Sequence, residues 1–82
     1  MDYNDYLTKE EQQAIYKENA DCGWGFTKEQ TLAYIETFRN GTDKDKASVL
    51  CRFEDVNYHT IGNLLEQGMI SAAIAKVNED FQ

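Results

Sequence analysis

Apolar side chains recur every three or four residues along most of the chain, which is the spacing of one face of an α-helix. In the middle of the sequence this spacing joins Val49, Leu50, Phe53 and Val56. Near the end it joins Ile70, Ala73, Ile74, Val77 and Phe81. No alternation of apolar and polar residues, as in a strand, competes with this pattern. The sequence therefore predicts an all-α fold.

Polar residues with capping chemistry mark where these helices begin and end. Thr8 stands three residues before Glu11 and Thr27 three before Gln30, and both pairs have the spacing of a capping box. Gly41 follows the second periodic segment, where we expect the left-handed conformation that commonly ends a helix. The pattern predicts a compact bundle of four or five short helices, over about 8–19, 27–40, 43–57 and 69–80, with a shorter one around 61–65 that ends before Gly68.

These helices are expected to share a single core. Its predicted members in the last three segments are Val49, Leu50, Phe53, Ile61, Leu64, Ile74 and Val77. Leu7 and Ile15 are expected to face inward from the first helix. Trp24 stands between two glycines in a predicted tight turn, just before Phe26. We favour Trp24 as a residue that closes the core between helices, and the alternative is an exposed aromatic anchor for a partner.

A length of 82 residues suits one small domain, which we assign to residues 1–82, with residues 1–7 as a mobile N-terminal segment. The chain has 15 acidic and 8 basic residues, so its net charge is −7. This excess argues against direct nucleic-acid binding and against attachment to an anionic membrane surface, because both need clustered cations. No stretch is apolar enough to span a membrane, and the acidic N-terminus is unlike a signal peptide. We therefore expect a cytoplasmic protein.

One stretch resembles a calcium-binding loop in part. Counted from Asp43 to Glu54 it has the right length, but Ala47 occupies a position that needs an oxygen ligand. The two aspartates at its start are equally suited to the N-terminus of a helix, whose dipole favours negative charge. We therefore expect neither a metal ion nor any other cofactor.

A second combination is Cys51, Asp55 and His59, which stand four residues apart. On one unbroken helix the first and last of them would be about 12 Å apart, which is too far for a nucleophile and its base. We therefore expect no enzymatic activity. Cys22 and Cys51 are expected to be reduced thiols that pack as small buried side chains.

The acidic residues bear most directly on function. Glu11 and Glu18 stand seven residues apart, and so do Glu29 and Glu36. The two members of each pair therefore lie on one face of their predicted helix, about 10.5 Å apart. Two aspartates precede the first helix, beside two tyrosines. A solvated surface explains such residues, whereas the functional interpretation is electrostatic docking on a protein with a basic surface. The candidate binding residues are Asp2, Asp5, Glu11, Glu18, Glu29 and Glu36.

In size, charge and compactness the chain resembles the small acidic proteins of phages and other mobile elements, which include anti-CRISPR and anti-restriction inhibitors. This resemblance implies a protein that blocks the nucleic-acid channel or the assembly of a host nuclease. It covers no motif and transfers no site residue. A second interpretation stays open: an adaptor or regulatory homodimer that uses the apolar, alanine-rich helix face at residues 69–75. A helix-turn-helix protein is disfavoured, because no Lys or Arg lies between Arg52 and Lys76 to contact phosphates.

Overall fold

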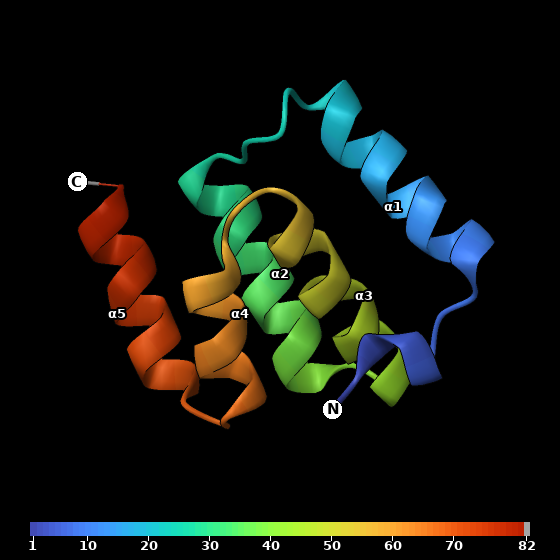
Figure 1. Cartoon of the computed structure of the whole chain (residues 1–82). Coiled ribbons are helices and arrows are strands. Elements are labelled where there is room, and N and C mark those ends of the chain that lie inside the picture. Colours follow the sequence, from blue (N-terminus) through green and yellow to red (C-terminus); the bar gives the residue numbers. More distant parts are fainter. Residues whose placement is uncertain (82) are drawn as a thin grey trace.

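Five α-helices follow one another in the computed structural model, which describes residues 1–81 (Figure 1). They are α1 (Lys9–Asp21), α2 (Lys28–Asn40), α3 (Asp43–Asp55), α4 (His59–Glu66) and α5 (Ile70–Asp80). A short 3-10 helix, η1 (Tyr3–Asp5), precedes them. The described residues contain no strand. The predicted all-α bundle is confirmed.

Capping residues begin the first two helices where the sequence predicts them. The side chains of Thr8 and Thr27 each accept a hydrogen bond from the amide three residues later, and Glu11 and Gln30 accept in turn from the threonine amides. A third capping box, with Thr42 as its first residue, begins α3. These local hydrogen bonds satisfy amides that an isolated helix end would leave unpaired.

Gly41 ends α2 for a reason other than the predicted one. Its φ of −89° is ordinary extended backbone, so the expected left-handed conformation is wrong. A Cβ atom at this position would lie 2.5 Å from the carbonyl oxygen of Thr37 and 2.6 Å from the Cβ of Asp45. Glycine is needed here because the chain passes so closely from α2 to α3. Gly68, with a φ of 79°, does have the left-handed conformation after α4.

The helix α3 is central in the molecule. It packs against η1, α1, α2 and α4, while α5 packs against α2 and α4. Figure 1 shows α1 and α5 on opposite sides, with the other three helices between them. Because α3 is covered on more than one side, it has to bury apolar residues on more than one face.

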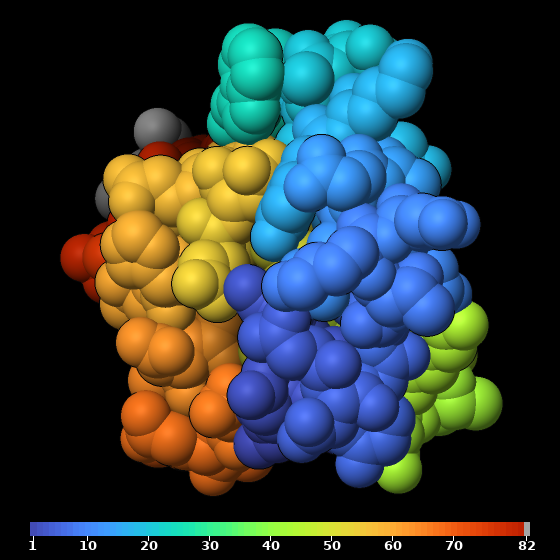
Figure 2. Space-filling view, turned by 45° about the vertical axis from the view of Figure 1, so that its right-hand side comes forward, coloured from blue at the N-terminus to red at the C-terminus, as the bar shows by residue number. Residues whose placement is uncertain are grey.

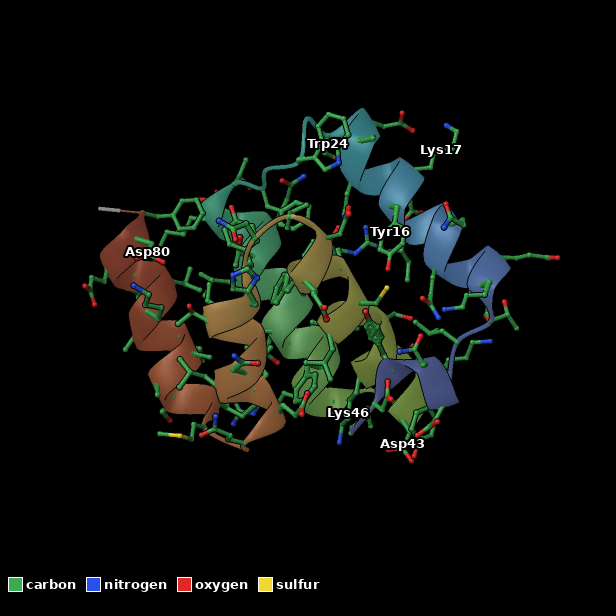
Figure 3. All side chains as sticks on the ribbon, viewed as in Figure 1. Tyr16, Lys17, Trp24, Asp43, Lys46 and Asp80 are labelled. Carbon is green, nitrogen blue, oxygen red and sulfur yellow. The ribbon has the colours of Figure 1, made fainter. Side chains whose placement is uncertain are left out.

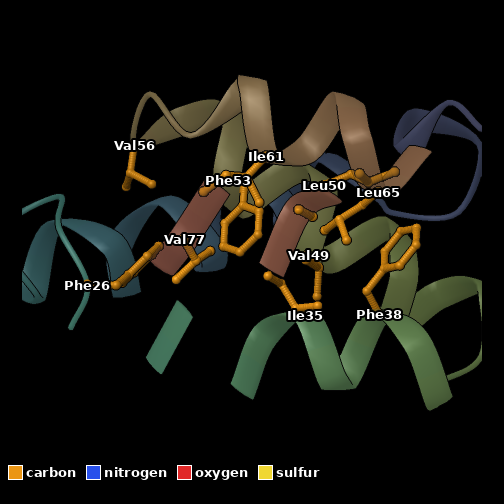
Figure 4. Packing of buried hydrophobic residues seen from close by; sticks show 11 residues of the cluster. Phe26, Ile35, Phe38, Val49, Leu50, Phe53, Val56, Ile61, Leu65 and Val77 are labelled. Carbon is orange, nitrogen blue, oxygen red and sulfur yellow. The ribbon is translucent and has the colours of Figure 1, made fainter. Parts of the chain in front are cut away.

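The apolar residues accordingly form two clusters rather than the predicted single core. The larger cluster joins α2 to α5 (Figure 4) and contains Phe26, Ile35, Phe38, Val49, Leu50, Phe53, Val56, Ile61, Leu65, Ala73 and Val77. The smaller cluster lies on the side of α3 that α1 and the N-terminal segment cover, and it contains Leu7, Ile15, Ala47 and Cys51.

Most of the predicted core residues are buried, and two lie at the edge of the larger cluster. Leu64 and Ile74 are half-buried against it, so their predicted place inside the core is only partly right. On α4 Leu65 is buried rather than Leu64, and on α5 Ala73 is buried rather than Ile74. Each of these two residues is four positions from another buried residue, and such pairs share one helix face.

Candidate interaction site

The first pair of candidate binding residues, Glu11 and Glu18, already has partners inside the molecule. Glu11 forms an ion pair with Lys44 of α3, in addition to its hydrogen bond from the Thr8 amide. Lys44 lowers the pKa of Glu11, and the Thr8 amide lowers that pKa further. Glu18 accepts a 2.7 Å hydrogen bond from Arg52, which also belongs to α3. Both glutamates therefore hold α1 on α3.

A fully buried asparagine, Asn19, strengthens the same interface. Its side-chain amide donates to the carbonyl oxygen of Arg52 and to the carboxylate of Asp55, both at 3.1 Å. Its side-chain oxygen accepts from the Arg52 guanidinium at 3.2 Å. That guanidinium lies 4.8 Å from the centre of the Tyr34 ring. Sequence patterns could not reveal Asn19, because its partners are more than thirty residues away along the chain.

The second pair, Glu29 and Glu36, lies exposed on α2. Glu36 accepts a hydrogen bond from Asn40 at 2.7 Å and lies 3.6 Å from Arg39. Glu29 has no ion-pair partner among residues 1–81. Because α2 packs against α3 and α5, whereas α1 packs against α3, the two pairs stand on separate parts of the surface.

The N-terminal segment, residues 1–7, packs against α3 through η1. Asp2 accepts hydrogen bonds from the backbone amide of Asn4 at 2.9 Å and from its side chain at 3.0 Å, and these bonds lower the pKa of Asp2. The Asn4 side chain also accepts from Gln12 of α1 at 3.0 Å. Asp5 is exposed. The mobility expected of this segment stays a prediction.

An acidic groove of about 350 Å³ lies where the N-terminal segment meets α3 and α4. Its lining includes the carboxylates of Asp2, Glu54 and Glu66 together with the single histidine, His59. Gly62 of α4 also lines it. Figure 2 shows this face of the molecule, with the blue N-terminal segment beside the orange α4. The groove thus gathers negative charge from three separate elements.

Two of these carboxylates stand where the helices themselves disfavour them. Glu54 is the residue before the last of α3, and Glu66 is the last of α4, whereas the C-terminal end of a helix dipole favours cations. Glu66 lies 3.8 Å from the terminal amine of Met1, and Glu54 has no cation beside it in the described part of the chain. Burial raises the pKa of Tyr3, and the charge of Glu54 raises it further. Sequence reasoning did not single out these two glutamates, because α1 and α5 also end in carboxylates and only the fold brings Glu54 and Glu66 together.

The prediction that Trp24 closes the core is wrong. Its exposed fraction is 59%, and Figure 3 shows it in the loop at the end of α1. Phe26 is buried instead, with its ring 5.1 Å from that of Tyr34 and 5.5 Å from that of Tyr58. The reason lies in the backbone, since Gly23 and Trp24 have consecutive positive φ angles of 73° and 57°. This reversal of the chain leaves Trp24 outside and brings Phe26 back to the core.

Both cysteines are free, and only one is buried as predicted. Cys22 follows the last residue of α1 and is exposed, because the loop that begins there leaves the helix surface. Cys51 is buried beside Tyr16, and burial raises the pKa of its thiol. His59 begins α4 and lines the acidic groove, while Asp55 contacts α1, so these residues do not converge on Cys51. Among residues 1–81 no three His, Cys, Asp or Glu side chains are placed to hold a metal ion.

Comparison with other proteins adds no further assignment to these residues. In the part of the chain that the structure describes, no helix combines the length and the apolar character that a membrane span requires. No family model, curated protein or solved structure matches the chain.

Proposed function

We propose that the protein is a non-catalytic module that binds a partner protein through a basic surface of that partner. The observation that carries this proposal is the acidic groove, where Glu54 and Glu66 place negative charge at helix C-termini. Charge in such positions stabilises neither helix. Residues that lower stability in this way are typical of functional sites. An Arg or Lys side chain of a partner would compensate the negative charge of the groove.

The volume and the lining of the groove favour a charged side chain over an apolar ligand. Sites for small molecules enclose roughly 300–1,000 Å³ and are lined mostly by apolar groups. The groove has about 350 Å³, at the low end of this range, and carboxylate, amide and imidazole groups contribute much of its lining. An arginine side chain fits such a lining, because its five N–H donors match carboxylate oxygens.

The charge of the whole chain supports the same class of partner. Of the 15 carboxylates, only six have a cation beside them within residues 1–81. The remainder act together on an approaching molecule, since exposed charge of one sign speeds encounter with a surface of the opposite sign. Enzymes that bind nucleic acids have basic surfaces for phosphates. The proposed activity is therefore inhibition of such an enzyme, of the anti-CRISPR or anti-restriction type that phages and mobile elements carry.

The structure changes how the candidate carboxylates should be used in experiments. Asp2 lines the groove, and the exposed residues Asp5, Glu29 and Glu36 are suited to steering the encounter. Glu11 and Glu18 add to the negative electrostatic field of the protein, but they also hold α1 on α3. A charge reversal at either of these two glutamates would alter the fold and the binding together.

The alternative of an apolar homodimer or adaptor has less surface to use than the sequence suggests. At residues 69–75, Ala73 is fully buried, and Ile70 and Ile74 pack half-buried against the larger cluster. Met69 is the large apolar side chain left exposed on this segment, at 47%. Most of the apolar face is thus already covered by α2 and α4.

Displacement of DNA from purified nucleases tests the proposal. A CRISPR nuclease and a restriction endonuclease are each bound to fluorescein-labelled DNA, and the protein is titrated in at low and at high salt. We expect displacement from one of them. Direct binding of the protein to that nuclease without DNA should weaken at high salt, because charges are screened over about 8 Å at physiological ionic strength and over a shorter distance at higher salt. We expect the double variant Glu54→Gln with Glu66→Gln to be about tenfold weaker, which corresponds to 1.4 kcal/mol.

A matched control removes the same amount of charge outside the groove. Glu10→Gln with Glu79→Gln changes two exposed glutamates that do not line it, so it weakens the general attraction equally but should displace the DNA clearly better than the groove variant does. The groove variant should melt no lower than the wild type, because it removes charge from helix C-termini. Equal displacement by the groove variant and the wild type, or none by the wild type, contradicts the proposal.

A further inference from the structure

The single tryptophan is held outward in a fixed loop. Trp24 has a φ of 57°, in the left-handed region that bulky side chains rarely occupy. Its amide donates a 2.8 Å hydrogen bond to the carbonyl oxygen of Asn19, and the Gly23 amide donates to that of Ala20 at 2.9 Å. The backbone is therefore fixed at the end of α1, although the side chain is 59% exposed. Strained residues of this kind occur preferentially at functional sites.

The glycines on either side leave the Trp24 side chain uncovered. A Cβ atom at Gly23 or Gly25 would meet nothing within 4 Å, so both positions have room for a side chain. Gly23 is suited to its positive φ, whereas Gly25 has no positive φ to explain it. Neither crowding nor backbone conformation requires a glycine at position 25. Its effect is to remove a side chain next to the indole ring.

Two carboxylates are connected to the Trp24 loop, one along the chain and the other through Asn19. Asp21 is the last residue of α1 and is exposed, and it already forms an ion pair with Lys17 at 3.1 Å. Asp55, at the end of α3, accepts from the side chain of Asn19, whose backbone oxygen accepts from Trp24. Asp55 has no cation beside it among the described residues. An aromatic face near carboxylates suits a guanidinium group, which stacks on the ring while its N–H groups donate to oxygen.

We propose that Trp24 is the aromatic anchor of the interface and stacks on an arginine side chain of the partner's basic surface, with the carboxylate of Asp55 as an acceptor for that arginine. This inference rests on the proposed function and adds a second contact to the acidic groove. Exposed tryptophans are typical binding hot spots because a large, rigid ring loses little conformational entropy on binding. The contact selects arginine over lysine, since the planar guanidinium stacks and an ammonium does not.

Fluorescein-labelled decaarginine and decalysine peptides test this contact on the full chain. The emission of Trp24 reports on the contact directly, because the chain has one tryptophan. We expect decaarginine to change this emission and to protect it from acrylamide quenching. Peptide anisotropy should show decaarginine binding about two- to fivefold tighter than decalysine, the range of an exposed cation–π contact.

Two substitutions at position 24 distinguish loss of the aromatic contact from loss of folding stability. Trp24→Gly should remove the preference for decaarginine, while Trp24→Phe should keep part of it because a ring remains. Since glycine adopts positive φ without strain, Trp24→Gly should melt no lower than the wild type, and its weaker binding then has no origin in unfolding. Unchanged Trp24 emission at saturating decaarginine overturns the inference, and so does an undiminished arginine preference in Trp24→Gly.

The groove variant distinguishes failure of this inference from failure of the proposed function. Glu54→Gln with Glu66→Gln should weaken the binding of both peptides equally and leave the arginine preference in place. A lost preference in Trp24→Gly without any effect of the groove variant supports the Trp24 contact and contradicts the groove. Weaker binding by the groove variant, together with an undiminished arginine preference in Trp24→Gly, supports the groove and contradicts the Trp24 contact.

Discussion

Glu11 has two partners at once, the Thr8 amide that its carboxylate caps and the Lys44 ammonium across the interface between α1 and α3. They lower its pKa in the folded protein from the ordinary value of 4.5. The ionised form therefore stabilises the fold above that pH, and this contribution is lost as the pH falls through the lowered pKa. Glu11→Gln keeps the capping hydrogen bond, so we expect it to be less stable than the wild type at pH 7 and this deficit to be smaller at about pH 3. Urea unfolding at both pH values measures the difference.

The neighbouring residue is the matched control for this prediction. Glu10 lies in the same first turn but has no cation beside it in the described part of the chain. Glu10→Gln should therefore show a smaller change between the two pH values. A deficit of Glu11→Gln that is the same at both pH values would mean that the ion pair with Lys44 adds nothing to stability.

The contact between α1 and α3 depends on Asn19 in addition to apolar packing. Its side chain is fully buried and forms hydrogen bonds with Arg52 and Asp55. Asn19→Ala would leave the carbonyl oxygen of Arg52 without this donor, and a buried group without a partner costs about 1–3 kcal/mol. We expect a loss of that size in urea unfolding. Asn78→Ala, on the exposed side of α5, should change stability by less than about 0.5 kcal/mol, and equal losses in both variants would contradict this role.

The elements differ in how far the sequence predicts them. Helix starts are predictable because capping is local: Thr8 and Glu11 are three residues apart, and the same spacing recurs at Thr27. The docking of α1 is not, because it depends on a hydrogen bond between Asn19 and Arg52, 33 residues apart. The loop between α1 and α2 lies between these cases. Its glycines predict a turn, but the outward position of Trp24 follows from a positive φ that composition does not reveal.

At the scale of the molecule, the two proposed contacts require a broad partner surface. The N-terminal segment precedes α1 and the Trp24 loop follows it, and a helix of 13 residues is about 20 Å long. Figure 1 shows these two parts of the chain at opposite ends of α1. Standard interfaces bury about 800 Å² on each partner. The total accessible surface is 4957 Å², so a partner that engages both contacts would cover a sizeable part of the molecule.

Such a surface needs a rigid support, which the larger apolar cluster supplies around Phe53. The Phe53 ring is fully buried and lies within 6.2 Å of the rings of Phe26, Tyr34 and Tyr58, which come from three other segments. Phe53→Ala should cost about 3–5 kcal/mol. A domain of this size has about 4–12 kcal/mol in total. The variant should therefore unfold at a much lower urea concentration, or lack the helical circular dichroism of the wild type.

Two further variants show whether that loss depends on the position of Phe53. Phe81→Ala removes the same side chain at the half-buried edge of the cluster and should cost clearly less. Phe53→Leu leaves a smaller cavity and should give a folded protein with an intermediate loss, which can be measured even where the alanine variant does not fold. Equal losses of stability in Phe53→Ala and Phe81→Ala would mean that Phe53 contributes no more to the cluster than a residue at its edge. The groove and the Trp24 loop would then lack the common support that this packing provides.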